Sequence, residues 1–259
     1  MATLTRKRGV TPAPAVPVAR QEPSAVLFYA TCPRGLAGAL AEELAALGAT
    51  AVKAGEAGVE FEGPFELAYA VNLESRLATR ILVRLAKFDY RNESDIYEGA
   101  KRVRWHAHFG LDRTFKVETN AVKAPVKSLD FITLKVKDAI ADAFREALGR
   151  RPDVAPRSPD VRVHVFLDAK WCTLYLDTSG EPLFKRGRRE QVGEAPLKKN
   201  LAAGLIRLSG WKPGEPFIDP MCGAGTILVE AAEMALGLAP GRDRAFGFET
   251  LALHAGQIP

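Results

Sequence analysis

The order of hydrophobic and polar positions in the first 90 residues predicts alternating strands and helices. A short apolar run at 26–30 is typical of a strand, and leucines at helical spacing follow it up to Leu47, before the helix-ending Gly48. Two strands about a glycine turn come next, then a helix over 64–75 and a strand over 78–90. This β-α-β-β-α-β order is the ferredoxin-like pattern.

The following residues predict a second mixed unit. A helix is expected over 93–103, and an alternating strand pattern occupies 114–122. A long amphipathic helix is expected over 128–149, because its apolar residues recur every four positions. Two further strands, 161–167 and 171–177, are joined by a short hairpin connection.

From Leu183 onwards the pattern predicts the beginning of a third unit. A helix over 196–210 starts with proline and ends at glycine. A strand ending at Ile218, a glycine-rich turn and another helix follow. Such a turn, at the carboxyl end of a strand, is where α/β folds bind ligands. The predicted fold class is therefore an α+β N-terminal part followed by the start of an α/β, Rossmann-like domain.

Composition agrees with a globular protein. Hydrophobic residues make up 47% and charged residues 26%, and no long uncharged apolar stretch predicts a transmembrane helix. Residues 1–24 are basic and rich in proline and alanine, so we expect a disordered tail, with a transit peptide as the alternative. Three widely spaced cysteines favour a reducing, cytoplasmic location. The net charge of +5 allows a nucleic-acid partner, and the four histidines show no metal-ligand spacing.

The clearest chemical signal is the turn between Ile218 and the last helix. Two glycines let the backbone turn tightly and approach a ligand, and free N–H groups at the helix start can hold a carboxylate or phosphate. The spacing is neither that of a P-loop nor GxGxxG. The turn consists of Asp219, Pro220, Met221, Cys222, Gly223, Ala224, Gly225 and Thr226.

A second signal is a dense group of basic residues after the last predicted strand. This basic cluster consists of Lys185, Arg186, Arg188 and Arg189. The planar donor fork of arginine suits phosphate, so the cluster predicts RNA contact, to which Lys123 and Lys127 could add. A solvated loop is the alternative. Phe166, Trp171 and Tyr175 lie on nearby predicted strands and could stack bases, although core packing is the favoured role.

The string DPMCGAGT resembles motif I of class I S-adenosylmethionine-dependent methyltransferases, in the form found in amino-directed enzymes. Other segments extend the resemblance over about residues 26–250 to the THUMP-bearing large-subunit ribosomal RNA guanine-N2 methyltransferases. These segments are CPRGL, ESRLATRI, FKVETNAV, LKVKDAIADAF, APRSPDVRVHVFL, TLYLDTSGEPLFKRGRR and EAPLKKNLAAGLI. The resemblance implies a ferredoxin-like and a THUMP domain that bind RNA. It also implies a Rossmann-like domain that transfers a methyl group from S-adenosylmethionine to the N2 amine of guanine.

The same resemblance implies which residues contact the cofactor. The 219–226 turn would line its methionine part, and Pro196, Leu197 and Lys198 would flank the same pocket. Lys199 stands where the family usually has Glu. The family's Asn/Asp-Pro-Pro-Tyr/Phe motif, which holds the target amine, does not occur in the 259 residues. We therefore assign no catalytic residue, and we expect a C-terminally truncated chain that is inactive alone.

The pattern and the resemblance together predict four segments. They are a tail over 1–24, a ferredoxin-like domain over 25–92, a THUMP domain over 93–182 and an incomplete methyltransferase domain over 183–259. RNA, above all ribosomal RNA, is the expected partner, with no membrane and no metal. Two other classes stay open: an RNA-binding module without catalysis, and a DNA amino-methyltransferase. A thiouridine synthase is disfavoured, because it would need an ATP-binding P-loop. The sequence does not predict an oligomeric state.

Overall fold

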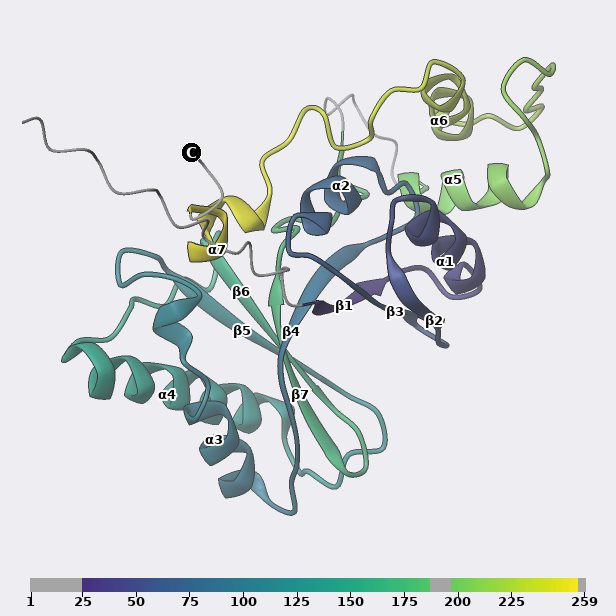
Figure 1. Ribbon diagram of the computed structural model, residues 1–259. Coiled ribbons are helices and arrows are strands. Elements are labelled where there is room, and N and C mark those ends of the chain that lie inside the picture. The colour runs from purple at the N-terminus through teal and green to yellow at the C-terminus, as the bar shows by residue number, and fades with distance from the viewer. Residues whose placement is uncertain (1–24, 187–196, 256–259) are drawn as a thin grey trace, which may run out of the picture.

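One seven-stranded sheet runs through the N-terminal two thirds of the protein, in the order β2-β3-β1-β4-β7-β6-β5 (Figure 1). The structure is a computed structural model that describes residues 25–186 and 197–255. All neighbouring strands are antiparallel except β5 and β6. The strands are β1 (Val26–Thr31), β2 (Thr50–Ala54), β3 (Gly58–Gly63), β4 (Arg80–Asp89), β5 (Phe115–Ala121), β6 (Val161–Leu167) and β7 (Trp171–Asp177).

The helices begin and end where local chemistry favours it. The Asn92 side chain accepts hydrogen bonds from the first backbone N–H groups of α3, and Ser128 does the same for α4. Gly149, in the left-handed region at φ 72°, ends α4. The helices are α1 (Ala37–Ala46), α2 (Leu67–Glu74), α3 (Glu93–Lys101), α4 (Leu129–Leu148), α5 (Lys199–Leu208), α6 (Thr226–Ala235) and α7 (Ala252–Ala255), with 3₁₀ turns at Trp105–Ala107 and Gly247–Thr250.

The two faces of the sheet differ in chemistry. Strand register places Phe28, Phe61, Val83 and Leu176 on one face, and all four are almost fully buried. They join one hydrophobic core with apolar residues of α1 to α4, so these four helices cover that face. The opposite face carries polar and aromatic side chains, among them Tyr29, which lies opposite Leu82 in the register.

The first two predicted units share this sheet. Strand β4, from the first unit, pairs with β7, from the second, along the run from Leu82↔Asp177 to Asp89↔Trp171. The register shifts once, between Arg84 and Ala86. The predicted boundary near residue 92 therefore separates two sequence units that are joined by continuous backbone hydrogen bonding.

The predicted strands and helices up to residue 177 are confirmed, with shifts of a few residues at their ends. The strand expected to end at Ile218 is wrong: residues 211–220 form no strand, and the Ile218 side chain is 85% exposed. A parallel strand needs neighbours that satisfy its backbone groups, and no described strand pairs with this segment. Among the described residues, no helix is long and apolar enough to cross a membrane.

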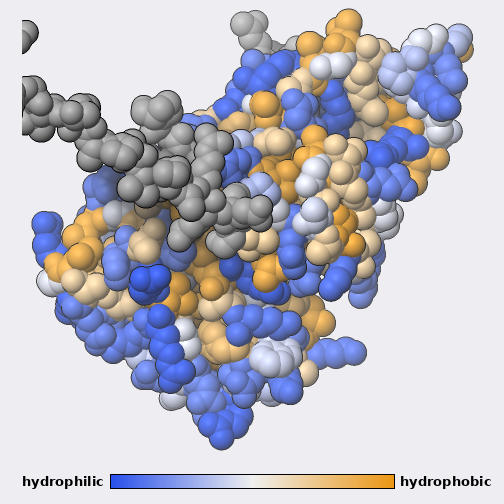
Figure 2. Space-filling model, in the orientation of Figure 1, coloured by the Kyte–Doolittle hydropathy of each residue, from blue (hydrophilic) through white to orange (hydrophobic). Residues whose placement is uncertain are grey.

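Large hydrophobic side chains are exposed around α5 and α6. Figure 2 shows orange side chains among blue ones at the end of the molecule that α6 occupies in Figure 1. The exposed residues in this part are Leu205, Leu208, Ile218, Met221, Val229 and Leu236.

Candidate functional site

The turn over 219–226 leads directly into α6, and its backbone requires glycine at two places. Gly223 and Gly225 have φ values of 51° and 74°, in the left-handed region that side chains with a Cβ rarely adopt. No heavy atom lies within 4 Å of where a Cβ would stand at either glycine. Asp219 Oδ1 accepts from the Met221 N–H at 3.0 Å, which holds the turn. The turn is therefore shaped by its own residues and leaves space beside its backbone.

The first backbone N–H groups of α6, next to this turn, have no side-chain hydrogen-bond acceptor at the N-cap. Gly225 is the N-cap of α6, and it has no side chain that could accept from the first N–H groups. These groups carry the positive end of the helix dipole. An arrangement of this kind can hold a carboxylate or a phosphate.

Glu230 on α6, whose exposed fraction is 1%, forms buried ion pairs that connect the helix to the rest of the molecule. The carboxylate accepts from Arg76 Nη1 at 2.8 Å and from Arg186 Nη2 at 2.6 Å. Arg76 lies between α2 and β4 and also donates to the carbonyl oxygens of Glu233 and Leu238. The turn is thus carried on a helix whose buried charge is paired with Arg76, which lies between α2 and β4, and with Arg186, which follows β7.

This ion pair corrects one prediction about the basic cluster. Arg186 is only 6% exposed and binds Glu230, so the prediction that it contacts RNA is wrong: its guanidinium is already engaged inside the protein. Lys185 is exposed and pairs with Glu181 at 2.8 Å. Arg188 and Arg189 lie outside the described residues.

Two further residues of the predicted RNA contact are at the surface. Lys123 and Lys127 are both exposed on the segment between β5 and α4. Phosphate contact by these lysines, and by Lys185, stays a prediction.

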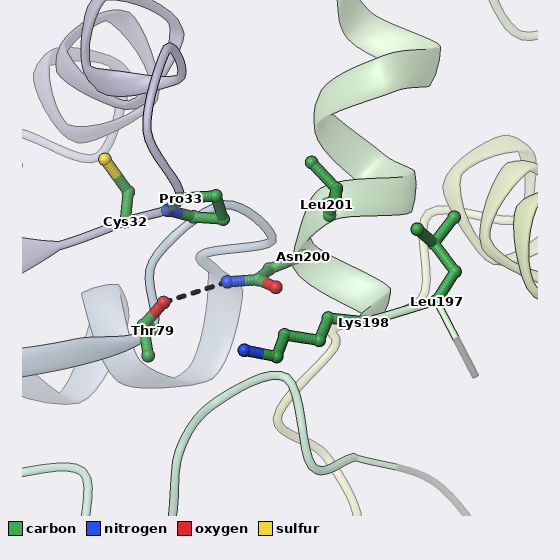
Figure 3. Close-up of a pocket in the computed structure, with 7 residues that line it drawn as sticks. All are labelled: Cys32, Pro33, Thr79, Leu197, Lys198, Asn200 and Leu201. Carbon is green, nitrogen blue, oxygen red and sulfur yellow. Dashed lines mark hydrogen bonds between the residues drawn. The ribbon is translucent and has the colours of Figure 1, made fainter. Parts of the chain in front are cut away.

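A pocket of about 560 Å³ lies at the N-terminal end of α5 (Figure 3). Its lining residues are Cys32, Pro33, Thr79, Leu197, Lys198, Asn200 and Leu201. Two residues predicted to flank the cofactor, Leu197 and Lys198, therefore line a pocket, whereas Pro196 lies outside the described residues. None of the residues of the 219–226 turn lines it. The structure does not bring the two predicted groups together in this pocket.

Asn200 is a pocket residue that the sequence reasoning missed. Its side chain is fully buried, and its Nδ2 donates to Thr79 Oγ1 at 3.0 Å (Figure 3). Its Oδ1 has no hydrogen-bond partner among the described residues. A buried acceptor without a partner costs about 1–3 kcal/mol, so this oxygen suits a donor from a bound molecule. The available signal was a polar residue at a buried helical position, beside Ala203.

Cys32 and Lys198 are the ionisable side chains among the lining residues of this pocket. Burial raises the pKa of the Cys32 thiol, so it stays protonated and is a poor nucleophile. Lys198 Nζ lies 5.1 Å from the centre of the Phe184 ring. In the part of the chain that the structure describes, no three His, Cys, Asp or Glu side chains gather to hold a metal ion.

Three family models match the chain in succession. Residues 27–82 match the RlmL ferredoxin-like domain, and residues 90–177 match the THUMP domain. Residues 186–257, which include the 219–226 turn, match the RMKL-like methyltransferase domain.

Individual relatives agree with this order. The chain is 44% identical over 236 residues to the ribosomal RNA large subunit methyltransferase K/L of Cellvibrio japonicus (strain Ueda107). The alignment covers 89% of this chain and 31% of that protein, so the chain spans about a third of the relative.

Solved structures show the same architecture. A predicted N6-adenine-specific DNA methylase from Listeria monocytogenes superimposes with a TM-score of 0.80 at 33% identity, covering 90% of this chain and 61% of that one. SMU.472, crystallised in complex with SAH, gives a TM-score of 0.78 at 32% identity, covering 87% and 60%. The chain thus contains an RlmL ferredoxin-like domain and a THUMP domain, followed by a segment that belongs to the RMKL-like methyltransferase domain family.

Proposed function

We propose that the chain is the RNA-binding and cofactor-binding part of an S-adenosylmethionine-dependent methyltransferase that modifies the N2 amine of a guanine in large-subunit ribosomal RNA. The observation that carries the proposal is the 219–226 turn on α6, joined through Glu230 to Arg76 in the segment that matches the ferredoxin-like domain. The name of the Cellvibrio relative supports ribosomal RNA as the substrate, and the complex of SMU.472 with SAH supports the cofactor.

The donor set of the turn fits the methionine end of S-adenosylmethionine, which supplies an electrophilic methyl group when bound. The N–H groups at the start of α6 would hold the carboxylate. Gly223 and Gly225 leave room for a close approach of the backbone, and Asp219 keeps the turn in shape through the Met221 N–H. Leu197 and Lys198 would border the same cofactor at the start of α5.

The exocyclic amine of guanine is a poor nucleophile, because its lone pair is delocalised into the ring. Catalysis of its methylation therefore depends on positioning and on hydrogen bonds to the amine. In this chain, the THUMP and ferredoxin-like parts would position the RNA, and the pairing of Glu230 with Arg76 would position α6 and the cofactor turn relative to the ferredoxin-like part. We assign the hydrogen bonds to the amine to no residue of this chain.

Photo-crosslinking of radiolabelled S-adenosylmethionine tests the cofactor site, because it captures weak binding. We expect label on the peptide that contains 219–226. In Gly223→Val the label should fall about tenfold, since a β-branched residue in the left-handed region costs on the order of 1–2 kcal/mol. Gly214→Val is the matched control, because Gly214 also has a positive φ and open space around it but lies outside the turn. Equal labelling of both variants would contradict the proposed site.

A competition experiment separates the two other function classes. The Listeria neighbour is named as a DNA methylase, so duplex DNA and structured ribosomal RNA are offered together to the chain. Preference for RNA with crosslinked cofactor supports the proposal. RNA binding with no crosslink supports an RNA-binding module, and preference for DNA supports an amino-methyltransferase acting on DNA.

A further inference from the structure

The sheet face that α1 to α4 leave free carries a pocket of about 500 Å³. Strands β1, β3, β4, β5, β6 and β7 all contribute lining residues, so the pocket belongs to the ferredoxin-like and the THUMP part together. Its size and its mixture of aromatic and polar walls are those of a small-molecule site. It shares only Thr79 with the pocket beside α5.

Aromatic rings form much of the wall. The ring centres of Tyr29 on β1 and Tyr175 on β7 lie 5.9 Å apart, and Tyr175 is only 8% exposed. Phe166 on β6 lines the same pocket and keeps 37% of its surface exposed. A planar ring could therefore enter from solvent beside Phe166 and lie against aromatic surface.

Hydrogen-bonding groups stand around these rings. Glu60 neighbours Tyr29 in the register, and Glu118 neighbours His164, which in turn neighbours Tyr175. Burial raises the pKa of Glu118, but Lys116 at 3.0 Å and nearby positive charge outweigh it and hold that pKa below its usual range. The carboxylates are acceptors for the amino and imino groups of a ligand's edge.

Positive charge lies at one end of the pocket. Lys87 lines it, and the Lys87 and Lys170 ammonium groups stand 5.4 and 5.0 Å from the centre of the Trp171 ring. Both lysines are exposed, Asp168 directly follows the strand that carries Phe166, and Trp171 begins β7. The pocket thus combines an aromatic interior, carboxylate acceptors and a basic end.

We propose that this pocket binds a single unpaired base of RNA, with its ring against Phe166 and Tyr175 and its phosphates near Lys87 and Lys170. A base that is unpaired can leave its stack, lie on an aromatic side chain and offer its edge to acceptors, whereas a base inside a duplex cannot. The proposal rests on RNA binding by the proposed function and is independent of methyl transfer.

Fluorescence anisotropy with short labelled single-stranded RNA tests the pocket. Stacking on an aromatic side chain is worth about 1–3 kcal/mol per base, so Phe166→Ala should weaken binding by about fivefold or more. Phe166 is partly exposed, which keeps the effect of the substitution on folding small. Phe131→Ala is the matched control, because Phe131 is 46% exposed on α4, which packs on the opposite face, and it should leave the affinity unchanged.

A second measurement keeps the result independent of small changes in folding. Ultraviolet crosslinking of the parent chain to the same RNA should label the peptide that spans β6 and β7, and duplex RNA of the same sequence should label it much less. Unchanged affinity of Phe166→Ala, or crosslinks confined to other peptides, would overturn the pocket while leaving the proposed function standing.

Two further outcomes also decide the matter. If the parent chain binds no RNA, the pocket proposal fails together with the RNA-binding part of the proposed function. If a free mononucleotide displaces the oligonucleotide at equal concentration, the site takes a nucleotide instead of a base within a chain, and the proposal is overturned.

Discussion

At the scale of single residues, the most consequential side chain is Glu230. Its carboxylate binds both Arg76 and Arg186, and all three side chains are at most 13% exposed. Neutralising a buried acid that faces two arginines leaves their charges without compensation. Such a loss is far more costly than the loss of a surface ion pair.

We therefore expect Glu230→Gln to lower the free energy of unfolding by about 3–5 kcal/mol, measured by chemical denaturation. Amide exchange in α6 should rise with it. Glu42→Gln is the control, because Glu42 pairs with Arg207 at 3.1 Å at the surface and its loss should cost less than about 1 kcal/mol. Equal costs for the two variants would show that the buried pair does not anchor α6.

Asp177 gives a residue-scale prediction about pH. Burial raises its pKa, but His164, Arg80 and the Ser179 N–H outweigh this and lower the pKa below that of an ordinary aspartate. A depressed folded-state pKa contributes stability above the unfolded value, about 4, and that stability is lost as the pH falls towards the folded value. Unfolding free energy should therefore fall below about pH 4 more steeply in the parent than in Asp177→Asn.

Denaturation curves at several acidic pH values measure this slope. Asp243→Asn serves as the control, since the Asp243 side chain is 65% exposed. The control should retain the slope of the parent. A parent and an Asp177→Asn variant with the same slope would mean that the folded state does not hold this carboxylate ionised.

At the scale of elements, local pattern was sufficient wherever an element buries one face in the core. Alternation over 161–167 and four-residue spacing over 128–149 predicted β6 and α4, because core packing selects those periods. The segment ending at Ile218 offers only the apolar pair Phe217 and Ile218 after Pro216, and it forms no strand. A strand is completed by its neighbours, and an apolar run does not reveal whether they are present.

The candidate sites also differ in whether their residues are neighbours in the sequence, and this decides how well the sequence predicts them. The glycine-rich turn over 219–226 and the helix after it could be predicted from the sequence, because their residues are contiguous. Arg186 was misread as exposed, because a run of charge is usually solvated and its partner Glu230 stands 44 positions further along the chain. The pocket on the free sheet face draws on six strands, so no local pattern could reveal it.

At the scale of the whole molecule, the shared sheet makes the ferredoxin-like and THUMP parts one mechanical unit. Strand β4 stands near the centre of the order, with β1 on one side and β7 on the other. Apolar residues from both parts belong to one hydrophobic core. An RNA that binds the free face would therefore meet a single rigid surface and not two hinged domains.

This unity predicts cooperative unfolding. Phe28 on β1 is 2% exposed and stacks on Phe61 with ring centres 5.0 Å apart, so Phe28→Ala should cost about 3–5 kcal/mol. Because the sheet is continuous, amide exchange should accelerate in β6, on the THUMP side, by the same free energy as in β3. Leu208→Ala, at a side chain that is 64% exposed, should change neither by more than about 0.5 kcal/mol. Faster exchange in β3 with β6 unaffected would mean that the two parts open separately, and the base pocket between them would then lose its rigid wall.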